Sequence, residues 1–176
     1  MKKAFSLLAA VLFGFPAYAQ VSPGGPGLTS EVCVAPTVTA NTYSANNTLG
    51  GLLTFSNITG LSASGVVQSV RIQFKDTRTE EFDLYLFSAN PSNTTWTDRS
   101  SPTLTGADLL VPYSPIRLTS PATGLGAGTV YGLDGLGRSV KFSNSTLYGV
   151  VITPNGTTSL GSSSDVQICV TVMRDN

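Results

Sequence analysis

Acidic side chains gather between residues 76 and 83, where they could take part in chemistry. The cluster comprises Asp76, Glu80, Glu81 and Asp83. Glu81 and Asp83 are two residues apart and would project from the same face of a strand that began there. Paired carboxylates serve glycoside hydrolysis or hold Ca²⁺. The alternative is a solvated strand face whose charges discourage edge-to-edge aggregation.

Histidine is absent from the 176 residues, which excludes several classes of catalysis. Ser-His-Asp and Cys-His mechanisms and imidazole-based zinc sites all need it. An activated Ser would need a Lys base, and neither Lys75 nor Lys141 has a nucleophile motif beside it. Ten basic side chains balance ten acidic ones without a basic run, so no surface for nucleic acid is indicated. We assign no catalytic, cofactor-binding or metal-ligating residue and expect a non-enzymatic protein.

The first nineteen residues read as a signal peptide. Lys2 and Lys3 precede an apolar run, 4–15, and Pro16 breaks it ahead of the A-x-A cleavage signature at 17–19. The alternative, a short membrane anchor, conflicts with a run well below the roughly 20 residues that span a bilayer. Residues 20–30 form a Pro/Gly-rich leader, and 31–176 form one domain. We expect an exported protein, periplasmic or extracellular, with no membrane span.

Export would place the two cysteines in an oxidising compartment. In an oxidising compartment Cys33 and Cys169 are most simply a disulfide, whereas in cytosol a thiol site would be considered. The bond would tie the first strand of the domain to the last. Those strands must then be near neighbours, with Cα atoms about 4.4 to 6.8 Å apart.

Three segments alternate between apolar and polar residues as half-buried strands do. Along 65–75, Val66, Val70, Ile72 and Phe74 share one face. Along 82–87, Phe82, Leu84 and Leu86 oppose Asp83, Tyr85 and Phe87. Near the end, Val166, Ile168, Val170 and Val172 alternate with Gln167, Cys169, Thr171 and Met173.

Further strands are predicted at 31–39, 51–56, 107–111, 116–119, 129–133, 139–142 and 146–153, with a hairpin turn at 132–137. Five Asn-x-Ser/Thr triplets, at Asn46, Asn57, Asn93, Asn144 and Asn155, are interpreted as markers of exposed loops. No mature segment keeps a helical apolar stripe. About nine or ten short strands favour an all-β, two-sheet sandwich of jelly-roll or Greek-key type, with a closed barrel as the alternative.

The loop at 88–100 is the candidate contact surface. It holds the only Trp, Trp96, among Asn, Ser and Thr residues, and its candidate contact residues are Asn90, Asn93, Trp96 and Asp98. A polar loop that presents one large amphipathic ring has the composition of a binding surface. The alternative is that Trp96 folds back to plug one end of the sandwich.

One resemblance covers most of residues 43–172. Its segments are 43–46, 50–55, 66–70, 83–98, 107–109 and 147–150, and the most distinctive is the run Leu-Phe-x-Ala-Asn-Pro-Ser-x-Thr-Thr-x-Thr-Asp at 86–98. Together they resemble a family of small all-β proteins encoded by tailed phages and prophages, virion-associated and mostly without assigned activity. The resemblance implies no catalytic residues. A weaker resemblance, over 70–91, is to the jelly-roll P domain of subtilisin-like proteases.

Three functions remain. The first is a non-enzymatic structural or surface-interaction protein that contacts a protein or glycan surface or self-associates. The second is a carbohydrate-binding module, which would need exposed aromatics such as Trp96, Tyr113 and Tyr131 on one face. The third is a small glycan-active enzyme, which would need two carboxylates facing each other across a cleft.

Overall fold

Strands dominate the computed structural model, which describes residues 29–58, 64–110, 112–119, 121–122, 126–142, 144–157, 160–162 and 165–174. The predicted signal peptide and residues 20–28 of the predicted leader lie outside these ranges. Within them the chain forms ten strands and one 3₁₀ helix. The pairs within both sheets are antiparallel, so the prediction of an all-β fold is confirmed.

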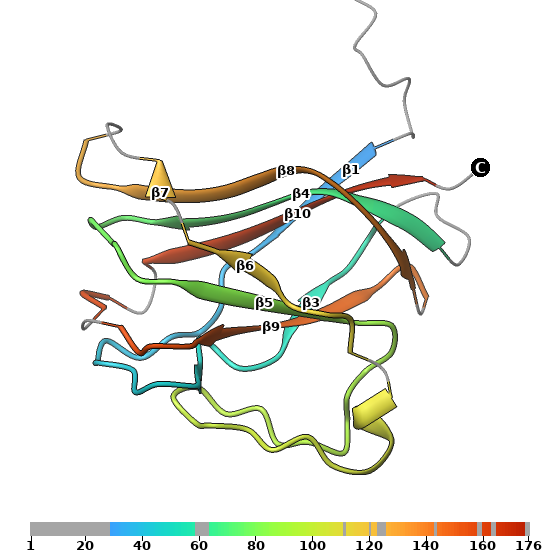
Figure 1. The fold of residues 1–176 in the computed structure, drawn as a ribbon, viewed down its shortest axis with the longest axis horizontal. Coiled ribbons are helices and arrows are strands. Elements are labelled where there is room, and N and C mark those ends of the chain that lie inside the picture. Colours follow the sequence, from blue (N-terminus) through green and yellow to red (C-terminus); the bar gives the residue numbers. More distant parts are fainter. Residues whose placement is uncertain are drawn as a thin grey trace, which may run out of the picture.

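Two sheets lie face to face as layers (Figure 1). The first has the order β1-β10-β4-β8-β7, with β1 at Thr29–Val34, β10 at Val166–Arg174, β4 at Ser64–Phe74, β8 at Thr129–Lys141 and β7 at Pro121–Ala122. The second has the order β2-β9-β5-β6, with β2 at Asn47–Thr48, β9 at Leu147–Thr153, β5 at Phe82–Phe87 and β6 at Ile116–Leu118; β3, at Leu53–Phe55, also pairs with β9. The chain passes from one sheet to the other after β1, β3, β4, β6, β8 and β9, which confirms the sandwich.

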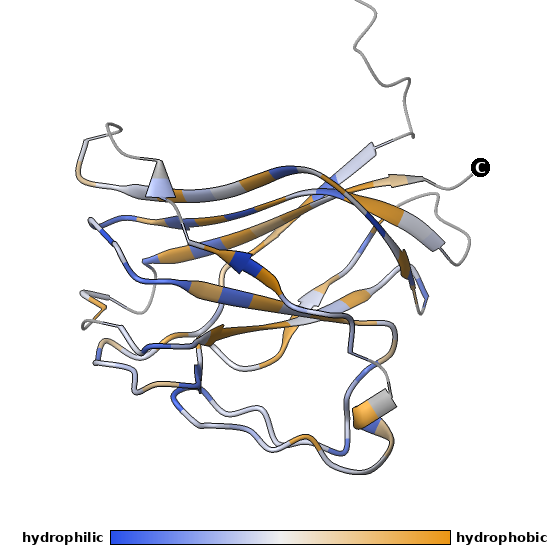
Figure 2. Ribbon diagram, viewed as in Figure 1, coloured by the Kyte–Doolittle hydropathy of each residue, from blue (hydrophilic) through white to orange (hydrophobic). Residues whose placement is uncertain are grey.

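The core lies between the sheets and follows the predicted alternation. Phe82, Leu84 and Leu86 of β5 belong to it, and so do Val166, Ile168, Val170 and Val172 of β10. Figure 2 shows hydrophobic residues recurring along the strands of both layers. The rings of Phe74, Phe82 and Tyr131 meet there, with centroids 5.0 to 6.0 Å apart. This aromatic cluster joins β4 and β8 of one sheet to β5 of the other.

The middle of the first sheet differs from the prediction. Residues 129–141 form one continuous strand, β8, and the predicted hairpin turn at 132–137 is a bulge within it, because three residues of β8 oppose Gln68 alone. Gly135 and Gly137 take φ values of 67° and 59°, a conformation that glycine adopts without strain. Gln68 is also an extra residue of β4 relative to β10, which moves Val67 into the core in place of Val66.

Residues 106–110 form a 3₁₀ helix, η1 (Gly106–Leu110), where a strand was predicted at 107–111. Gly106 has a φ of 55° and the Asp108 amide donates to the Thr105 carbonyl, so the chain turns instead of extending. The predicted strand at 31–39 ends at Val34, shortly before Pro36. In the described part of the chain, no helix is long and apolar enough to cross a membrane.

A disulfide joins Cys33 of β1 to Cys169 of β10, as predicted. The two residues are direct partners in the antiparallel register, which places their Cα atoms 4.0 Å apart, closer than the expected range. Non-hydrogen-bonded partners of an antiparallel pair already approach to about 4.5 Å, so pairing of the two strands brings the cysteines close enough to bond. The bond fastens the edge strand β1 to the interior strand β10.

Candidate binding site

The outward face of the second sheet is buried at two apolar positions. Phe87 of β5 and Val150 of β9 each have 1% of their surface exposed, although neither belongs to the core between the sheets. Tyr85, which pairs with Val150, also points outward. Another part of the chain must therefore cover this face.

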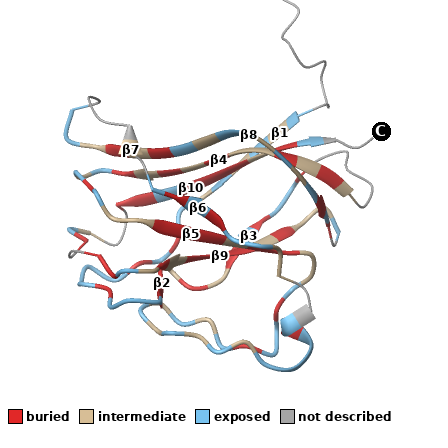
Figure 3. Ribbon diagram, viewed as in Figure 1, coloured by how far each residue is buried: buried red, intermediate tan, exposed pale blue. Residues whose placement is uncertain are grey.

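The covering segment is the long connection between β5 and β6, residues 88–115, which we call the 88–115 loop. It lies outside the second sheet, at the bottom of Figure 1. Most of its described residues are exposed or half-buried, in contrast to the buried residues of the strands (Figure 3). The loop thus has one side towards the sheet and one towards solvent.

Asp98 anchors the middle of this loop. Its carboxylate accepts hydrogen bonds from the backbone amide and hydroxyl of Thr39 (2.8 and 2.5 Å), the hydroxyl of Tyr43 (2.9 Å) and the amide of Gly50 (2.7 Å). Burial, and then the hydrogen bond to Asp98, hold the pKa of Tyr43 well above its usual value, so this phenol stays protonated and donates. Asp98 therefore connects the loop to the segments on both sides of β2.

Strand β2 contributes a second attachment. Thr48 is fully buried. Its amide donates to the carbonyl of Ser100 (2.8 Å), and its hydroxyl donates to the carbonyl of Thr97 (2.5 Å). Three residues after Thr48, Gly51 has a φ of 72°, and a Cβ there would lie 2.9 Å from the carbonyl oxygen of Trp96. The loop backbone can pass this close because position 51 has no side chain.

Trp96 packs inward and remains partly exposed. Its ring meets that of Phe87 edge-on, with centroids 5.5 Å apart, and its Nε1 donates to the carbonyl of Pro91 (2.9 Å). Trp96 therefore lies against the outer face of β5 and does not plug an end of the sandwich. The ring is held from two sides, which fixes its orientation.

A cavity of about 220 Å³ opens between the loop and the sheet. Its walls are largely apolar and come from Tyr85, Phe87, Trp96, Leu104, Val150 and Ile152. Asn46, Ser101 and Pro102 complete the lining. We call this cavity the outer-face pocket.

The four predicted contact residues play different parts here. Trp96 lines the outer-face pocket, whereas Asn90 is exposed and does not. Asn93 is exposed and donates from Nδ2 to Oδ1 of Asp108 (3.2 Å), and Asp98 is the anchor described above. No sequence pattern indicated Asn46, Val150 or Ile152 as binding residues. For Tyr85 the signal was its outward place in the alternation of 82–87.

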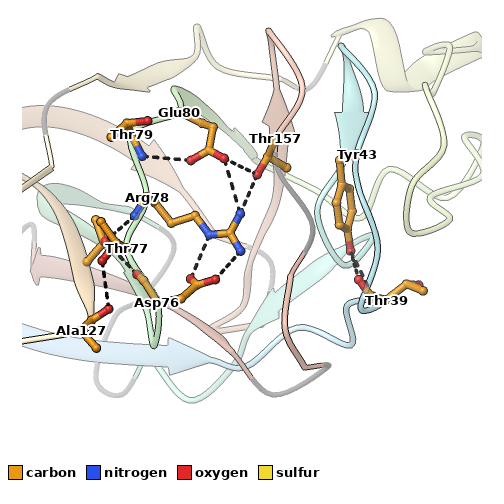
Figure 4. Close-up of polar contacts among 10 residues, drawn as sticks. Thr39, Tyr43, Asp76, Thr77, Arg78, Thr79, Glu80, Ala127 and Thr157 are labelled. Carbon is orange, nitrogen blue, oxygen red and sulfur yellow. Dashed lines mark hydrogen bonds and ion pairs between the residues drawn. The ribbon is translucent and has the colours of Figure 1, made fainter.

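Three residues of the acidic cluster form ion pairs, whereas the fourth, Glu81, accepts a hydrogen bond from Nδ2 of Asn155 (3.3 Å). Arg78 is 2% exposed; its guanidinium donates to both carboxylate oxygens of Asp76, at 2.9 and 2.6 Å, and to the hydroxyl of Thr157 (Figure 4). Glu80 lies 3.5 Å from the same guanidinium. Asp83 is buried on β5 and forms two hydrogen bonds, each of 2.8 Å, with Arg117 of β6. This pairing holds the pKa of Arg117 above its usual value.

The other predicted features are also located. Tyr131 is fully buried in the core and cannot join an exposed row with Trp96 and Tyr113. The Asn of each of the five Asn-x-Ser/Thr triplets is exposed, as predicted. Among the described residues, the one group of carboxylate and sulfur ligands close enough to share a metal ion is Glu31, Cys33 and Cys169, and its two sulfurs are bonded to each other.

Comparison with known proteins gives no relative to guide the assignment. No protein-family model matches the chain, and no curated protein matches it. The functional inference therefore depends on the geometry of the outer-face pocket and its loop.

Proposed function

We propose that this is an exported, non-enzymatic surface-interaction protein that binds its partner through the outer-face pocket. The observation that carries the proposal is that pocket itself, a largely apolar hollow beside the half-exposed Trp96. Aromatic anchors in fixed positions supply much of the energy of binding surfaces. Asp98, Thr48 and Phe87 hold the loop and its Trp in place before any partner arrives.

Export is supported by the predicted signal peptide and by the disulfide, which is compatible with an extracellular protein. Secreted material should begin at Gln20, because Ala17 and Ala19 fit a signal peptidase. Intact-mass analysis of that material tests this. A species outside the cytoplasm that kept residues 1–19 would contradict it.

The absence of enzymatic activity is part of the proposal. The carboxylates of Asp76, Glu80 and Asp83 are engaged with Arg78 and Arg117, where they serve the fold. The resemblance to virion-associated phage proteins points in the same direction, towards a structural or adhesive part that contacts a surface or a second copy.

Blocking the pocket tests the proposal. Ser101 lies at the pocket and is exposed, so Ser101→Arg introduces a long charged side chain there without emptying the core. Ser92→Arg makes the same change at an exposed position of the loop outside the pocket lining. Binding to bacterial envelope preparations is measured by biolayer interferometry, and self-association by sedimentation velocity.

We expect Ser101→Arg to weaken whichever interaction occurs by tenfold or more, about 1.4 kcal/mol, with Ser92→Arg unchanged. Both variants should keep the melting temperature, because neither position is buried. Equal binding by the two variants would show that the interaction occurs outside the pocket. The absence of any envelope binding or self-association would contradict the proposal.

A further inference from the structure

The lining of the outer-face pocket carries no charge. All nine lining residues are aromatic, aliphatic, hydroxyl or amide residues. A charged ligand would lose hydration on entry, and no charged side chain among the lining residues would compensate for that loss. The complementary ligand is therefore neutral.

Two polar groups at the pocket are available to such a ligand. Neither the side-chain amide of Asn46 nor the hydroxyl of Tyr85 has a hydrogen-bond partner among the described residues, and both residues line the pocket. The Ser101 hydroxyl donates to the carbonyl of Asn46 and can still accept. A ligand with several hydroxyl groups can use an amide, a phenol and a hydroxyl together.

The aromatic walls suit a ring with an apolar face. Trp96 uses its Nε1 on Pro91, so its contribution to a ligand comes from the carbon atoms of the indole. C–H groups carry slight positive charge and are attracted to the negative face of an aromatic ring. A pyranose combines such a C–H face with a rim of hydroxyl groups.

The size of the pocket limits the ligand to a small unit. Its volume, about 220 Å³, is below the roughly 300 to 1,000 Å³ of pockets for drug-sized molecules. One water takes about 30 Å³ in the liquid, so the space is that of roughly seven waters. This suits a single sugar ring better than an extended chain.

From these observations we infer that the outer-face pocket binds one neutral pyranose unit of a surface glycan. The inference rests on the proposed function and specifies its partner. The anchored Trp96 and Asp98 reduce the ordering that binding requires, since the loop is already fixed. The glycan continues outward past the exposed Ser101.

Trp96 is the only Trp in the protein, so its fluorescence reports on the pocket directly. Full-length mature protein is titrated with neutral monosaccharides (glucose, galactose, mannose and N-acetylglucosamine) and with sialic acid as the charged comparison. We expect at least one neutral sugar to change Trp96 emission with a dissociation constant on the order of 1 mM. Sialic acid should leave the emission unchanged.

Tyr85→Phe removes a hydroxyl and Asn46→Gly removes an amide while keeping a φ of 62° possible. Each should weaken sugar binding about 2- to 10-fold, the effect of one hydrogen bond. Tyr148→Phe is the matched control, because Tyr148 pairs with Phe87 of β5 but does not line the pocket. It should leave the affinity unchanged.

The outcomes separate the two proposals. If no neutral sugar changes the emission, or if Tyr85→Phe and Tyr148→Phe behave alike, the glycan assignment is wrong. Should Ser101→Arg still abolish envelope binding in that case, the pocket remains the contact site for another partner, such as a peptide. If Ser101→Arg abolishes the change of Trp96 emission on sugar addition and Ser92→Arg does not, the result supports both the pocket as the contact site and the glycan as its ligand.

Discussion

At the scale of single residues, two buried phenols show how a polar group is accommodated. The Tyr43 hydroxyl donates a hydrogen bond to the carboxylate of Asp98 and accepts one from the backbone amide of Thr39. The Tyr131 hydroxyl has no partner among the described residues, although its side chain is fully buried. An unsatisfied buried hydroxyl lowers stability, whereas a satisfied one contributes to it.

Tyr131→Phe should raise the free energy of unfolding by about 1 kcal/mol, because it removes a buried hydroxyl that makes no hydrogen bond and keeps the ring contacts. Urea denaturation of both proteins at neutral pH measures this. A loss of stability would mean that the hydroxyl has a partner in solution, such as a trapped water.

The same residue predicts a dependence on pH. Burial, and then the charge of Glu80, raise the pKa of Tyr131 to about 12 from its usual 10.0. Since the unfolded chain releases this proton first, stability should fall as the pH rises from 10 to about 12. Denaturation curves at about pH 9 and about pH 11.5 should differ more for the natural protein than for Tyr131→Phe. Equal losses in the two proteins would exclude Tyr131 as the cause.

Asp98→Ala should release the 88–115 loop, because four donors lose a charged acceptor. We expect a loss of about 2 kcal/mol in the free energy of unfolding and a red shift of Trp96 emission. Asp134→Ala is the matched control at an exposed position of β8 and should cost less than about 0.5 kcal/mol. An unshifted emission would show that the loop holds its place without Asp98.

At the scale of elements, the turn between β4 and β5 is fixed by a buried cation. Arg78 joins Asp76 and Glu80 of that turn to Thr157, which follows β9 (Figure 4). Its guanidinium carbon lies 5.5 Å from the ring centroid of Phe74. Arg71 of β4 makes a contrasting pair with Glu31 of β1, in which both side chains are more than 40% exposed. Buried and exposed pairs should therefore respond differently to the same change.

Arg78→Met should lower the free energy of unfolding by about 2 to 3 kcal/mol, because Glu80, 15% exposed, loses its counter-charge and Asp76 loses two hydrogen bonds from the guanidinium. Arg71→Met should cost about 0 to 1 kcal/mol, since water screens that pair. Chemical denaturation of the two variants side by side checks this. Similar losses would mean that the turn tolerates the removal of its cation.

At the scale of the whole molecule, one covalent bond connects the two ends of the described chain. The Cys33–Cys169 disulfide closes a loop with a sequence separation of 136 and holds the edge strand β1 against β10. Closing so long a loop restricts the unfolded chain, which raises its free energy relative to the folded state. The sandwich itself has an extensive core between its sheets, so the bond adds to a fold that burial already favours.

The double substitution Cys33→Ser with Cys169→Ser should lower the free energy of unfolding by about 2 to 5 kcal/mol and preserve the all-β circular dichroism spectrum. The natural protein, titrated under denaturing, non-reducing conditions, should show no free thiol. Two titratable thiols would rule out the bond.

Local sequence patterns predicted the all-β fold, the two faces of β5 and β10, and the pairing of the cysteines. These predictions depend on local alternation or on there being only two Cys, and none of them requires knowledge of distant contacts. The local pattern at 132–137 predicted a hairpin turn, but strand pairing determines the conformation there. Because β8 pairs with β4 on both sides of Gly135 and Gly137, these glycines form a bulge and not a hairpin.

The outer-face pocket and the ion pairs of the acidic residues depend on contacts between distant segments. Tyr85 and Val150 are far apart in the sequence and meet because β5 pairs with β9. Trp96 lines the same pocket because Asp98 and Thr48 hold the loop there. Asp76 and Glu80 lie near Arg78 in the sequence, yet their role depends on whether that guanidinium is buried. Burial arises from packing between distant segments, and no local spacing of residues specifies it.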